Sequence, residues 1–466
     1  MKFFLAIIFS LLQIPPLLAQ NVEIKGYING FEQGSTIRII KKADVFSGWD
    51  TTIAQQQIVN SNKFDLKFNI SYPAYVTLAI NLKKTSIFIS PGNKMTFKIF
   101  LDTTTQNKSV FGQTEMEIKE ISPVPKLNSD LITYNKMYNT FLINNFRKVF
   151  QYHEKQTVIL FTKQINERFG HISSDYLKNY IKYTVASLKR GARMMTDQQF
   201  LLKYFINKPV LYHNESYGDM FLNFFNSYFK RNIKSSVNPE ILAQVIPKRN
   251  YYLLDKIFEK DSLLKINARV RQLSEMLVLN NYFYNDSFDR KDIEILLQQI
   301  KNESKFIENR KVANHYLKKL MNLQPGTHAP EFILPDINGN EISLKSFSGK
   351  FVLLVFYKDN CPACEFQMNG LKNLQDNLGN ELQPVVIMKG KNITQLEKFL
   401  VANNVSWPVL LLGNQWMLLE KYRIKIFPSY ILINPNGTIG LIPAPFQEDH
   451  AVDKIRLYMN QYKKIK

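Results

Sequence analysis

The sequence predicts a multidomain chain in which a β-sandwich-like region, an α-helical region and an α/β domain follow one another. Three patterns lead to this prediction: short alternating apolar runs between turn residues, then apolar positions recurring every three or four residues, then alternating strands and helices. We place these regions at 20–113, 114–322 and 323–466, after an export segment at 1–19. A chain of 466 residues exceeds one ordinary core, which agrees with several domains.

The N-terminal segment has the pattern of a secretory signal peptide. Lys2 gives a positive start, an apolar run extends from Phe3 to Leu12, and Ala19 precedes the polar Gln20. The alternative is a membrane anchor, but the run is shorter than the ~20 residues of a span, and two prolines follow it. We expect cleavage after Ala19 and a location in the periplasm or cell envelope. No cysteine lies near this position, so we do not expect a lipoprotein.

The composition is that of a globular protein with a strongly basic surface. Apolar residues make up 45% and charged residues 21%, with a net charge of +21. The lysines are spread along the chain, which is typical of a solvated surface, and an exported protein is not expected to meet nucleic acid. Alternatively, the positive charge attracts the protein to anionic surfaces of the envelope, which would give peripheral membrane association.

Residues 20–113 contain short strand patterns. Phe64–Phe68 alternates strictly between apolar and polar residues, and part of Tyr75–Ile80 does the same. Ile87–Ile89 ends at a Ser-Pro-Gly turn, and Met95–Phe100 follows it. Short strands at this spacing favour a sandwich, and no cluster of acids, histidines or cysteines marks a site within them.

Residues 114–322 show helical periodicity with many aromatic residues. One stripe runs from Leu131 to Phe146, and a second contains Tyr217, Phe221, Phe224, Phe225 and Tyr228. We interpret these stripes as the interior of a helix bundle; a groove for an unfolded client or a lipid is the alternative. The six histidines are scattered without metal-ligand spacing, so we expect no metal and no cofactor.

The region after a linker near Leu323–Thr327 alternates between strands and helices. Phe351–Phe356 and Val385–Met388 are continuous apolar runs, as strands buried on both faces require. A helix is expected from Ile393 to Asn403, and a closing helix from His450 to Tyr462.

Both cysteines of the chain stand in one C-x-x-C sequence, Cys361-Pro362-Ala363-Cys364. A disulfide there closes too small a loop to add much stability, which indicates redox chemistry. The N-terminus of a helix favours a thiolate, so Cys361 is predicted to be the nucleophile. Met368 and Leu371 fall on the same helical face as Cys364, which is therefore predicted to be buried and to act as the resolving thiol. Zinc would need more ligands, and a covalent haem would need histidine where Glu365 stands.

The C-terminal region resembles the thioredoxin superfamily, and most of all the bacterial TlpA- and ResA-type thiol-disulfide proteins. The matching segments are Gly326–Phe332, Asp336–Asn340, Gly349-Lys350, Cys361–Cys364, Trp407–Val409 and Ile426–Tyr430. The resemblance implies a thioredoxin-like fold with a cis-proline at Pro428 facing the disulfide, and a Phe427 backbone offered to an extended client. Weaker similarity at Gly26–Gly30, Asn62–Phe64 and Pro91-Gly92 indicates the small β domain that precedes the thioredoxin domain in many such proteins.

Three positions depart from this family. Asn360 stands where an aromatic residue usually precedes the first cysteine, and Val355 occupies the place of the buried acid of thioredoxin. Gln367 replaces the glutamate that follows the second cysteine in ResA-type proteins. A nearby carboxylate normally takes the proton of the resolving thiol, and we expect Glu365 to face solvent. Resolution is therefore predicted to use water or to be slow.

The resemblance implies a thiol-disulfide oxidoreductase of the envelope that reduces client disulfides and is recharged by a membrane electron donor. Its partners would be protein thiols and disulfides. One alternative is an envelope binding protein with a weakly active or vestigial thioredoxin domain. A peroxidase is a weaker alternative, because peroxiredoxins carry threonine three residues before the reactive cysteine and this chain has Lys358 there.

Overall fold

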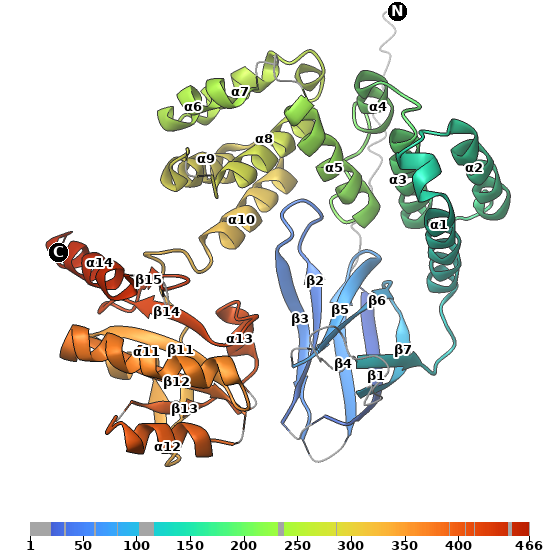
Figure 1. The fold of residues 1–466 in the computed structure, drawn as a ribbon. Helices are drawn as coiled ribbons and strands as arrows, with labels where there is room; N and C mark the ends of the chain where they lie inside the picture. Colours follow the sequence, from blue (N-terminus) through green and yellow to red (C-terminus); the bar gives the residue numbers. More distant parts are fainter. Residues whose placement is uncertain are drawn as a thin grey trace, which may run out of the picture.

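The computed structural model describes residues 20–31, 34–59, 62–81, 83–101, 116–231, 237–285, 287–390, 392–405, 407–413, 415–445 and 450–465 (Figure 1). The expected signal peptide at 1–19 lies outside the described residues. None of the helices within these ranges combines the length and apolar character that crossing a membrane requires.

The first part of the chain forms two four-stranded sheets that enclose one apolar core. The strands are β1 (Gln20–Asn29), β2 (Thr36–Lys42), β3 (Asp50–Gln57), β4 (Lys63–Ile70), β5 (Ala74–Ile80), β6 (Lys83–Ile89), β7 (Lys94–Leu101) and β8 (Met116–Glu120). Their orders are β4-β1-β7-β8 and β3-β2-β5-β6. The strict alternation of β4 buries Phe64, Leu66 and Phe68 and exposes the residues between them, as the sequence predicts.

Two strands correct the sequence analysis. β8 pairs with β7, so the first β region extends beyond the expected boundary at residue 113. Its sequence Met-Glu-Ile-Lys-Glu buries none of its side chains fully, and so it carries little apolar signal. β3 is an edge strand of the second sheet and is rich in threonine and glutamine. It too carries little apolar signal, so the sequence did not predict it.

The middle of the chain is helical. Its helices are α1 (Lys126–Phe150), α2 (Lys155–Phe169), α3 (Asp175–Gly191), α4 (Asp197–Tyr204), α5 (Glu215–Arg231), α6 (Pro239–Val245), α7 (Tyr251–Glu259), α8 (Ala268–Tyr282), α9 (Arg290–Glu303) and α10 (Ile307–Met321), with short 3₁₀ turns η2 (Ile246–Lys248) and η3 (Leu264–Ile266). The second aromatic stripe is fully inside the bundle, where Phe221, Phe224 and Phe225 have no exposed surface. The first stripe is only partly buried, since Phe146 at its end is 55% exposed.

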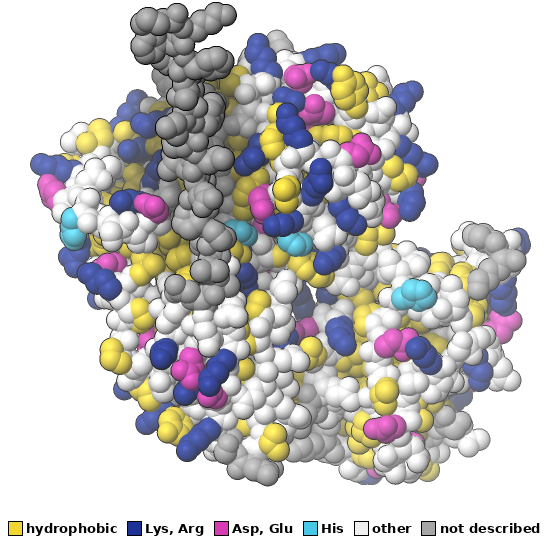
Figure 2. Space-filling view, turned by 180° about the vertical axis from the view of Figure 1, so that it is seen from behind, with side chains coloured by type: hydrophobic (Ala, Val, Ile, Leu, Met, Phe, Trp, Pro, Cys, Tyr) yellow, Lys and Arg dark blue, Asp and Glu magenta, His cyan; other side chains and the backbone are white. Residues whose placement is uncertain are grey.

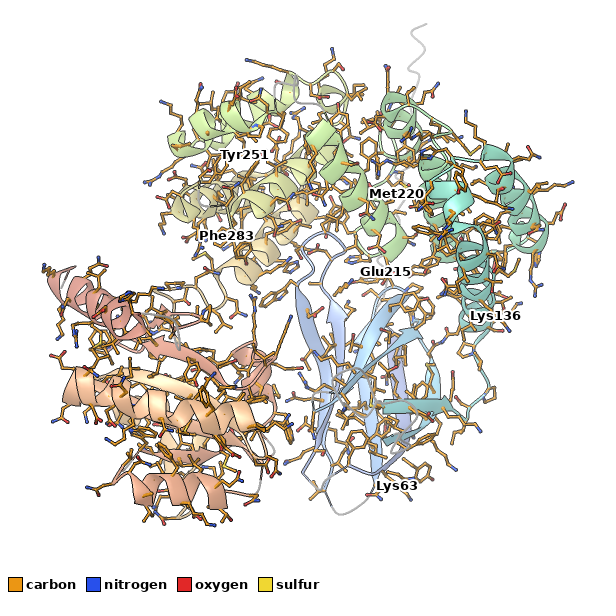
Figure 3. The ribbon with its side chains drawn as sticks, in the orientation of Figure 1. Lys63, Lys136, Glu215, Met220, Tyr251 and Phe283 are labelled. Carbon is orange, nitrogen blue, oxygen red and sulfur yellow. A yellow bond between two sulfur atoms is a disulfide. The ribbon has the colours of Figure 1, made fainter. Side chains whose placement is uncertain are left out.

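The loop between β2 and β3 anchors the sandwich in the helical region. The ring of Phe46 lies among those of Tyr212, Tyr217 and Phe221, within 5.0–6.1 Å between centroids. The buried carboxylate of Asp44 lies 2.7 Å from Nδ1 of His315 on α10. At the start of α5, labelled in Figure 3, the Glu215 carboxylate accepts a hydrogen bond from the backbone N–H of Tyr75 on β5. The two regions therefore share a core and polar contacts.

The last part of the chain has the thioredoxin-like fold that the sequence predicts. Its elements are β9 (Ile333–Pro335), β10 (Glu341–Ser343), η4 (Leu344–Phe347), β11 (Phe351–Lys358), α11 (Pro362–Leu378), η5 (Gly379–Glu381), β12 (Leu382–Lys389), α12 (Thr394–Ala402), β13 (Val409–Leu411), α13 (Met417–Lys421), β14 (Ser429–Ile433), β15 (Ile439–Leu441) and α14 (Ala451–Ile465). The sheet order is β13-β12-β11-β14-β15, which puts the almost entirely buried β11 at its centre.

The thioredoxin fold docks on the sandwich through α13, which faces β2 and β3 in Figure 1. The Glu420 carboxylate on α13 lies 2.6 Å from Nη1 of Arg38 on β2 and 2.9 Å from Nζ of Lys84 on β6.

Lys and Arg side chains are scattered over the face seen in Figure 2, with acidic side chains among them.

Candidate active site

The cysteine pair lies where the central strand of the thioredoxin sheet passes into its first helix. β11 ends at Lys358, and α11 begins at Pro362, so Cys361 is the N-cap residue of the helix. Asn360 has a φ of 50°, a left-handed conformation that asparagine tolerates better than most side chains do. Pro362 at the first helical position has no N–H that would remain unbonded.

Cys361 and Cys364 are joined in a disulfide, with Cα atoms 5.2 Å apart. The backbone N–H of Cys364 points at Cys361 Sγ, 3.2 Å away. Cys361 is partly exposed, whereas Cys364 is fully buried together with Met368 and Leu371 on the inner face of α11. The two sulfurs therefore differ in access, which is the arrangement that the helical periodicity predicts.

A loop from a distant part of the sequence lies against the exposed sulfur. The Phe427–Pro428 peptide bond is cis, the isomer that the resemblance implies. The carbonyl oxygen of Phe427 lies 3.9 Å from Cys361 Sγ. Ile426 is 73% exposed and Phe366, two residues after Cys364, is 76% exposed. Apolar side chains therefore stand uncovered on both segments that meet at the disulfide.

The two positions that lack the family carboxylates lie in the same buried region. Val355 is fully buried and faces Tyr430 across the pairing of β11 with β14. The hydroxyl of Tyr430 donates a hydrogen bond to Oε1 of Gln367. Burial raises the pKa of Tyr430 well above its usual value, so this hydroxyl stays protonated and remains a donor.

Two carboxylates approach the site from the side of β11. Asp359 packs against Gly390, where any Cβ would collide with the carboxylate, and its backbone N–H bonds to the Lys389 carbonyl. Burial, and then the charges of Glu365 and Asp359, raise the pKa of Tyr357 to about 12. Glu365 is half-buried, which corrects the expectation that it faces solvent.

Sequence reasoning missed two residues beside the site, Lys389 and Trp416. The Lys389 ammonium at the end of β12 lies 5.4 Å from the ring centre of Phe427 and 5.1 Å from that of Trp416. Burial, and then the charge of Lys358, lower the pKa of Lys389. No spacing in the sequence links these residues, because they come from three separate segments. In the described ranges, no group of three or more His, Cys, Asp or Glu side chains is arranged to hold a metal ion.

Comparisons with known proteins fall on this domain. The model of the AhpC/TSA family matches residues 325–442. The thiol-disulfide oxidoreductase ResA of Bacillus subtilis is 28% identical over 118 residues, which cover 25% of this chain and 65% of that protein. ResA of Geobacillus thermodenitrificans is 30% identical over 133 residues, which cover 28% of this chain and 74% of that protein.

The chain belongs to the ResA-like proteins of the thioredoxin superfamily.

A solution structure of a thiol:disulfide interchange protein from Bacteroides sp. is 26% identical, with a TM-score of 0.27, and covers 30% of this chain and 93% of that one. The ResA-like match spans about two thirds of the length of the Bacillus subtilis protein. The AhpC/TSA family match at residues 325–442 does not include the sandwich or the helical bundle.

Proposed function

We propose that this protein is a thiol-disulfide oxidoreductase that reduces disulfides of client proteins in the cell envelope. The observation that carries the proposal is the partly exposed Cys361 at the helix N-cap, bonded to the buried Cys364 and lying beside the Phe427 carbonyl. An exposed sulfur can meet a client, while a buried neighbour can act only on the first sulfur.

The reaction begins with the reduced pair. The Cys361 thiolate attacks one sulfur of a client disulfide, forms a mixed disulfide and expels the other client sulfur as a thiolate. The Cys364 thiolate then attacks Cys361, which restores the internal disulfide and releases the second client thiolate. Two electrons pass to the client, whose thiolates take protons from solvent. A dithiol donor, which we propose to be membrane-bound, reduces the pair again.

The client lies across the Phe427–Pro428 segment in this proposal. The exposed side chains of Ile426 and Phe366 supply apolar contacts, and the Phe427 backbone supplies hydrogen bonds.

The deciding measurement is the reduction potential of the Cys361–Cys364 couple, obtained by equilibration with glutathione or dithiothreitol buffers. A potential near that of thioredoxin, about −270 mV, supports a reductant. A potential near about −120 mV, as in strong oxidants, would reverse the proposed direction.

One alternative, an envelope binding protein with a weakly active thioredoxin domain, is favoured by the absence of a family carboxylate at Val355 and Gln367. A couple that equilibrates with glutathione but turns over no protein disulfide would support it.

The location in the envelope is part of the proposal and rests on the signal-peptide pattern of residues 1–19. Mass spectrometry of the native protein is expected to show a mature chain that begins at or near Gln20. Recovery of the intact N-terminal segment would contradict this.

A further inference from the structure

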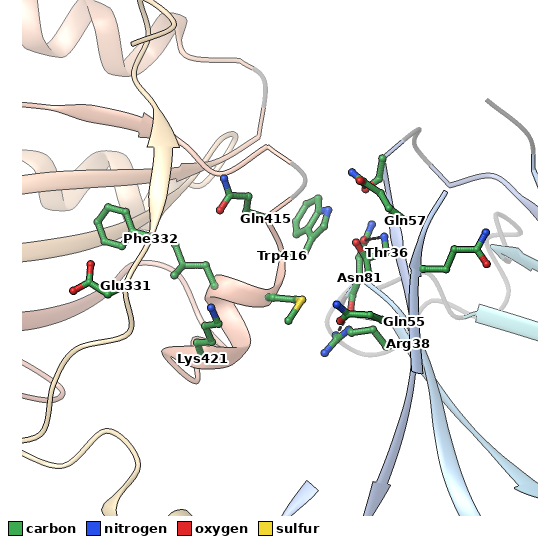
Figure 4. Close-up of a pocket in the computed structure, with 14 residues that line it drawn as sticks. Thr36, Arg38, Gln55, Gln57, Asn81, Glu331, Phe332, Gln415, Trp416 and Lys421 are labelled. Carbon is green, nitrogen blue, oxygen red and sulfur yellow. Dashed lines mark hydrogen bonds between the residues drawn. The ribbon is translucent and has the colours of Figure 1, made fainter. Parts of the chain in front are cut away.

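A groove with both polar and apolar side chains on its walls separates the β sandwich from the thioredoxin fold. Its volume is about 460 Å³. Figure 4 shows Thr36, Arg38, Gln55, Gln57 and Asn81 on the sandwich side, opposite a wall that the thioredoxin fold supplies. That wall carries the labelled side chains Glu331, Phe332, Gln415, Trp416 and Lys421.

The groove is lined by groups that complement a peptide backbone. Gln55 and Gln57 are two residues apart on β3 and therefore project from the same face. The amide of Gln55 is exposed and has no hydrogen bond to any other described residue. The buried indole N–H of Trp416, on the opposite wall in Figure 4, also has no hydrogen-bond partner among the described residues. Primary amides both donate and accept hydrogen bonds, as a peptide group does.

A continuous line of contacts connects this groove to the reactive sulfur. Trp416 forms part of the groove wall, and its ring centre lies 5.1 Å from Lys389 Nζ. The same ammonium lies 5.4 Å from the ring centre of Phe427, whose carbonyl oxygen is 3.9 Å from Cys361 Sγ. Extended chain advances about 3.3 Å per residue, so about five residues cover such a path.

We propose that an extended segment of the client polypeptide, beginning at the cysteine bonded to Cys361, runs past Phe427 and Trp416 into the groove. This inference rests on the proposed function and adds to it: the sandwich, which lies outside the family match, binds the client backbone about five residues from its cysteine. Lys389 and Lys421 favour an acidic side chain within that segment. A saccharide could bond to the same amides, but the line of contacts to Cys361 favours a polypeptide.

The test compares two substrates of different length. One is oxidised glutathione, which is too short to reach the groove. The other is a peptide of about eleven Ser, Asn and Glu residues with a central cysteine, held as its mixed disulfide with glutathione. For the full chain we expect kcat/KM to be higher for the peptide. In Gln55→Ala the ratio of the two values should fall about fivefold, and in Trp416→Ala about tenfold.

The matched control is Thr51→Ala, an exposed position on β3 that does not line the groove. It should keep the wild-type ratio, and Trp416→Phe should restore part of the loss because it retains an aromatic wall. Equal ratios in wild type, Gln55→Ala and Trp416→Ala would overturn the inference. Absence of turnover with both substrates would instead overturn the proposed redox function.

Discussion

At the scale of single residues, the two sulfurs of the redox pair differ in what can reach them. Cys361 is partly exposed at the N-cap of α11, whereas Cys364 has no exposed surface. Only the first can meet a bulky client disulfide, and a mixed disulfide persists when the second thiol is absent. From this difference in burial we propose that Cys361 attacks the client and that Cys364 resolves the mixed disulfide.

We predict that Cys364→Ser accumulates client proteins as mixed disulfides on Cys361, and that Cys361→Ser accumulates none. Non-reducing electrophoresis followed by mass spectrometry of the captured species checks this. Equal alkylation rates of the two thiols in the reduced protein would contradict the assignment.

Gln367 is the residue at which the site departs most informatively from its relatives. Its side-chain oxygen accepts the Tyr430 hydroxyl, so it lies in the buried region where a proton acceptor would serve the resolving thiol. We predict that Gln367→Glu speeds the decay of the mixed disulfide about tenfold near neutral pH, because it supplies a general base. Stopped-flow decay between about pH 6 and 9 measures it, and the wild-type rate should rise with pH.

Glu365→Gln is the matched variant for this measurement. Glu365 is half-buried and close enough to Tyr357 to contribute to the raised pKa of that phenol. Slower decay in Glu365→Gln, together with no change in Gln367→Glu, would show that Glu365 already serves as the base.

At the scale of secondary-structure elements, the β2–β3 loop stabilises the contact between the sandwich and the helical region. Phe46 from this loop is 4% exposed inside the aromatic core of the helical region, and the Tyr316 hydroxyl bonds to its carbonyl oxygen. We predict that Phe46→Ala lowers the free energy of unfolding by about 3–5 kcal/mol in urea titrations. Phe146→Ala, at a phenylalanine that is 55% exposed on α1, should cost less than about 1 kcal/mol.

The turn between β4 and β5 meets the segment before α5 through a stacked pair of rings. The centroids of Tyr72 and His213 are 3.8 Å apart. Burial, and then the nearby charge of Lys41, lower the pKa of His213 to about 4 from its ordinary 6.5. The folded state therefore holds the neutral imidazole, while the unfolded state binds a proton below about pH 6.5.

This depressed pKa gives a stability contribution that is fully present above about pH 6.5 and is lost as the pH falls toward 4. Between pH 7 and 5 we expect the free energy of unfolding, measured by urea titration, to fall by about 1–2 kcal/mol because of this histidine. His213→Phe keeps the ring stack without the titrating group. Between pH 7 and 5 its free energy of unfolding should therefore fall by about 1–2 kcal/mol less than that of the wild type. An unchanged pH dependence in His213→Phe would show that other groups cause the acid sensitivity.

At the scale of the whole molecule, the thioredoxin fold is fixed to the sandwich by Glu420. The Arg38 side chain that it binds is 4% exposed, so removal of the carboxylate leaves a buried charge without its counter-ion. We predict that Glu420→Gln weakens the docking and splits thermal unfolding into two calorimetric transitions, one of them from the released thioredoxin domain. Glu397→Gln, at an exposed position of α12, should unfold as the wild type does.

The same interface determines whether the groove exists. Its two walls come from different domains, and the Arg38–Glu420 ion pair is one of the contacts that join them. If Glu420→Gln splits the transitions, it should also reduce the preference for the long peptide substrate, because the groove needs both of its walls.

Local patterns in the sequence were enough to predict the thioredoxin-like fold, the position of the cysteine pair at the start of a helix and the inward face that buries Cys364. These features rest on local periodicity and on short motifs, so neighbouring residues are enough to specify them. Alternation likewise identified β4, whereas the polar β3 and the short β8 gave no comparable signal because neither has a fully buried apolar face.

The surroundings of the cysteine pair, and the contacts between the thioredoxin fold and the sandwich, could not be predicted from local patterns. The bond between Gln367 and Tyr430, the line of contacts from Phe427 through Lys389 to Trp416, and the pair of Arg38 with Glu420 each join segments that are far apart in the chain. Such contacts depend on how sheets and helices pack, and no periodicity within a segment encodes which distant segment will cover it.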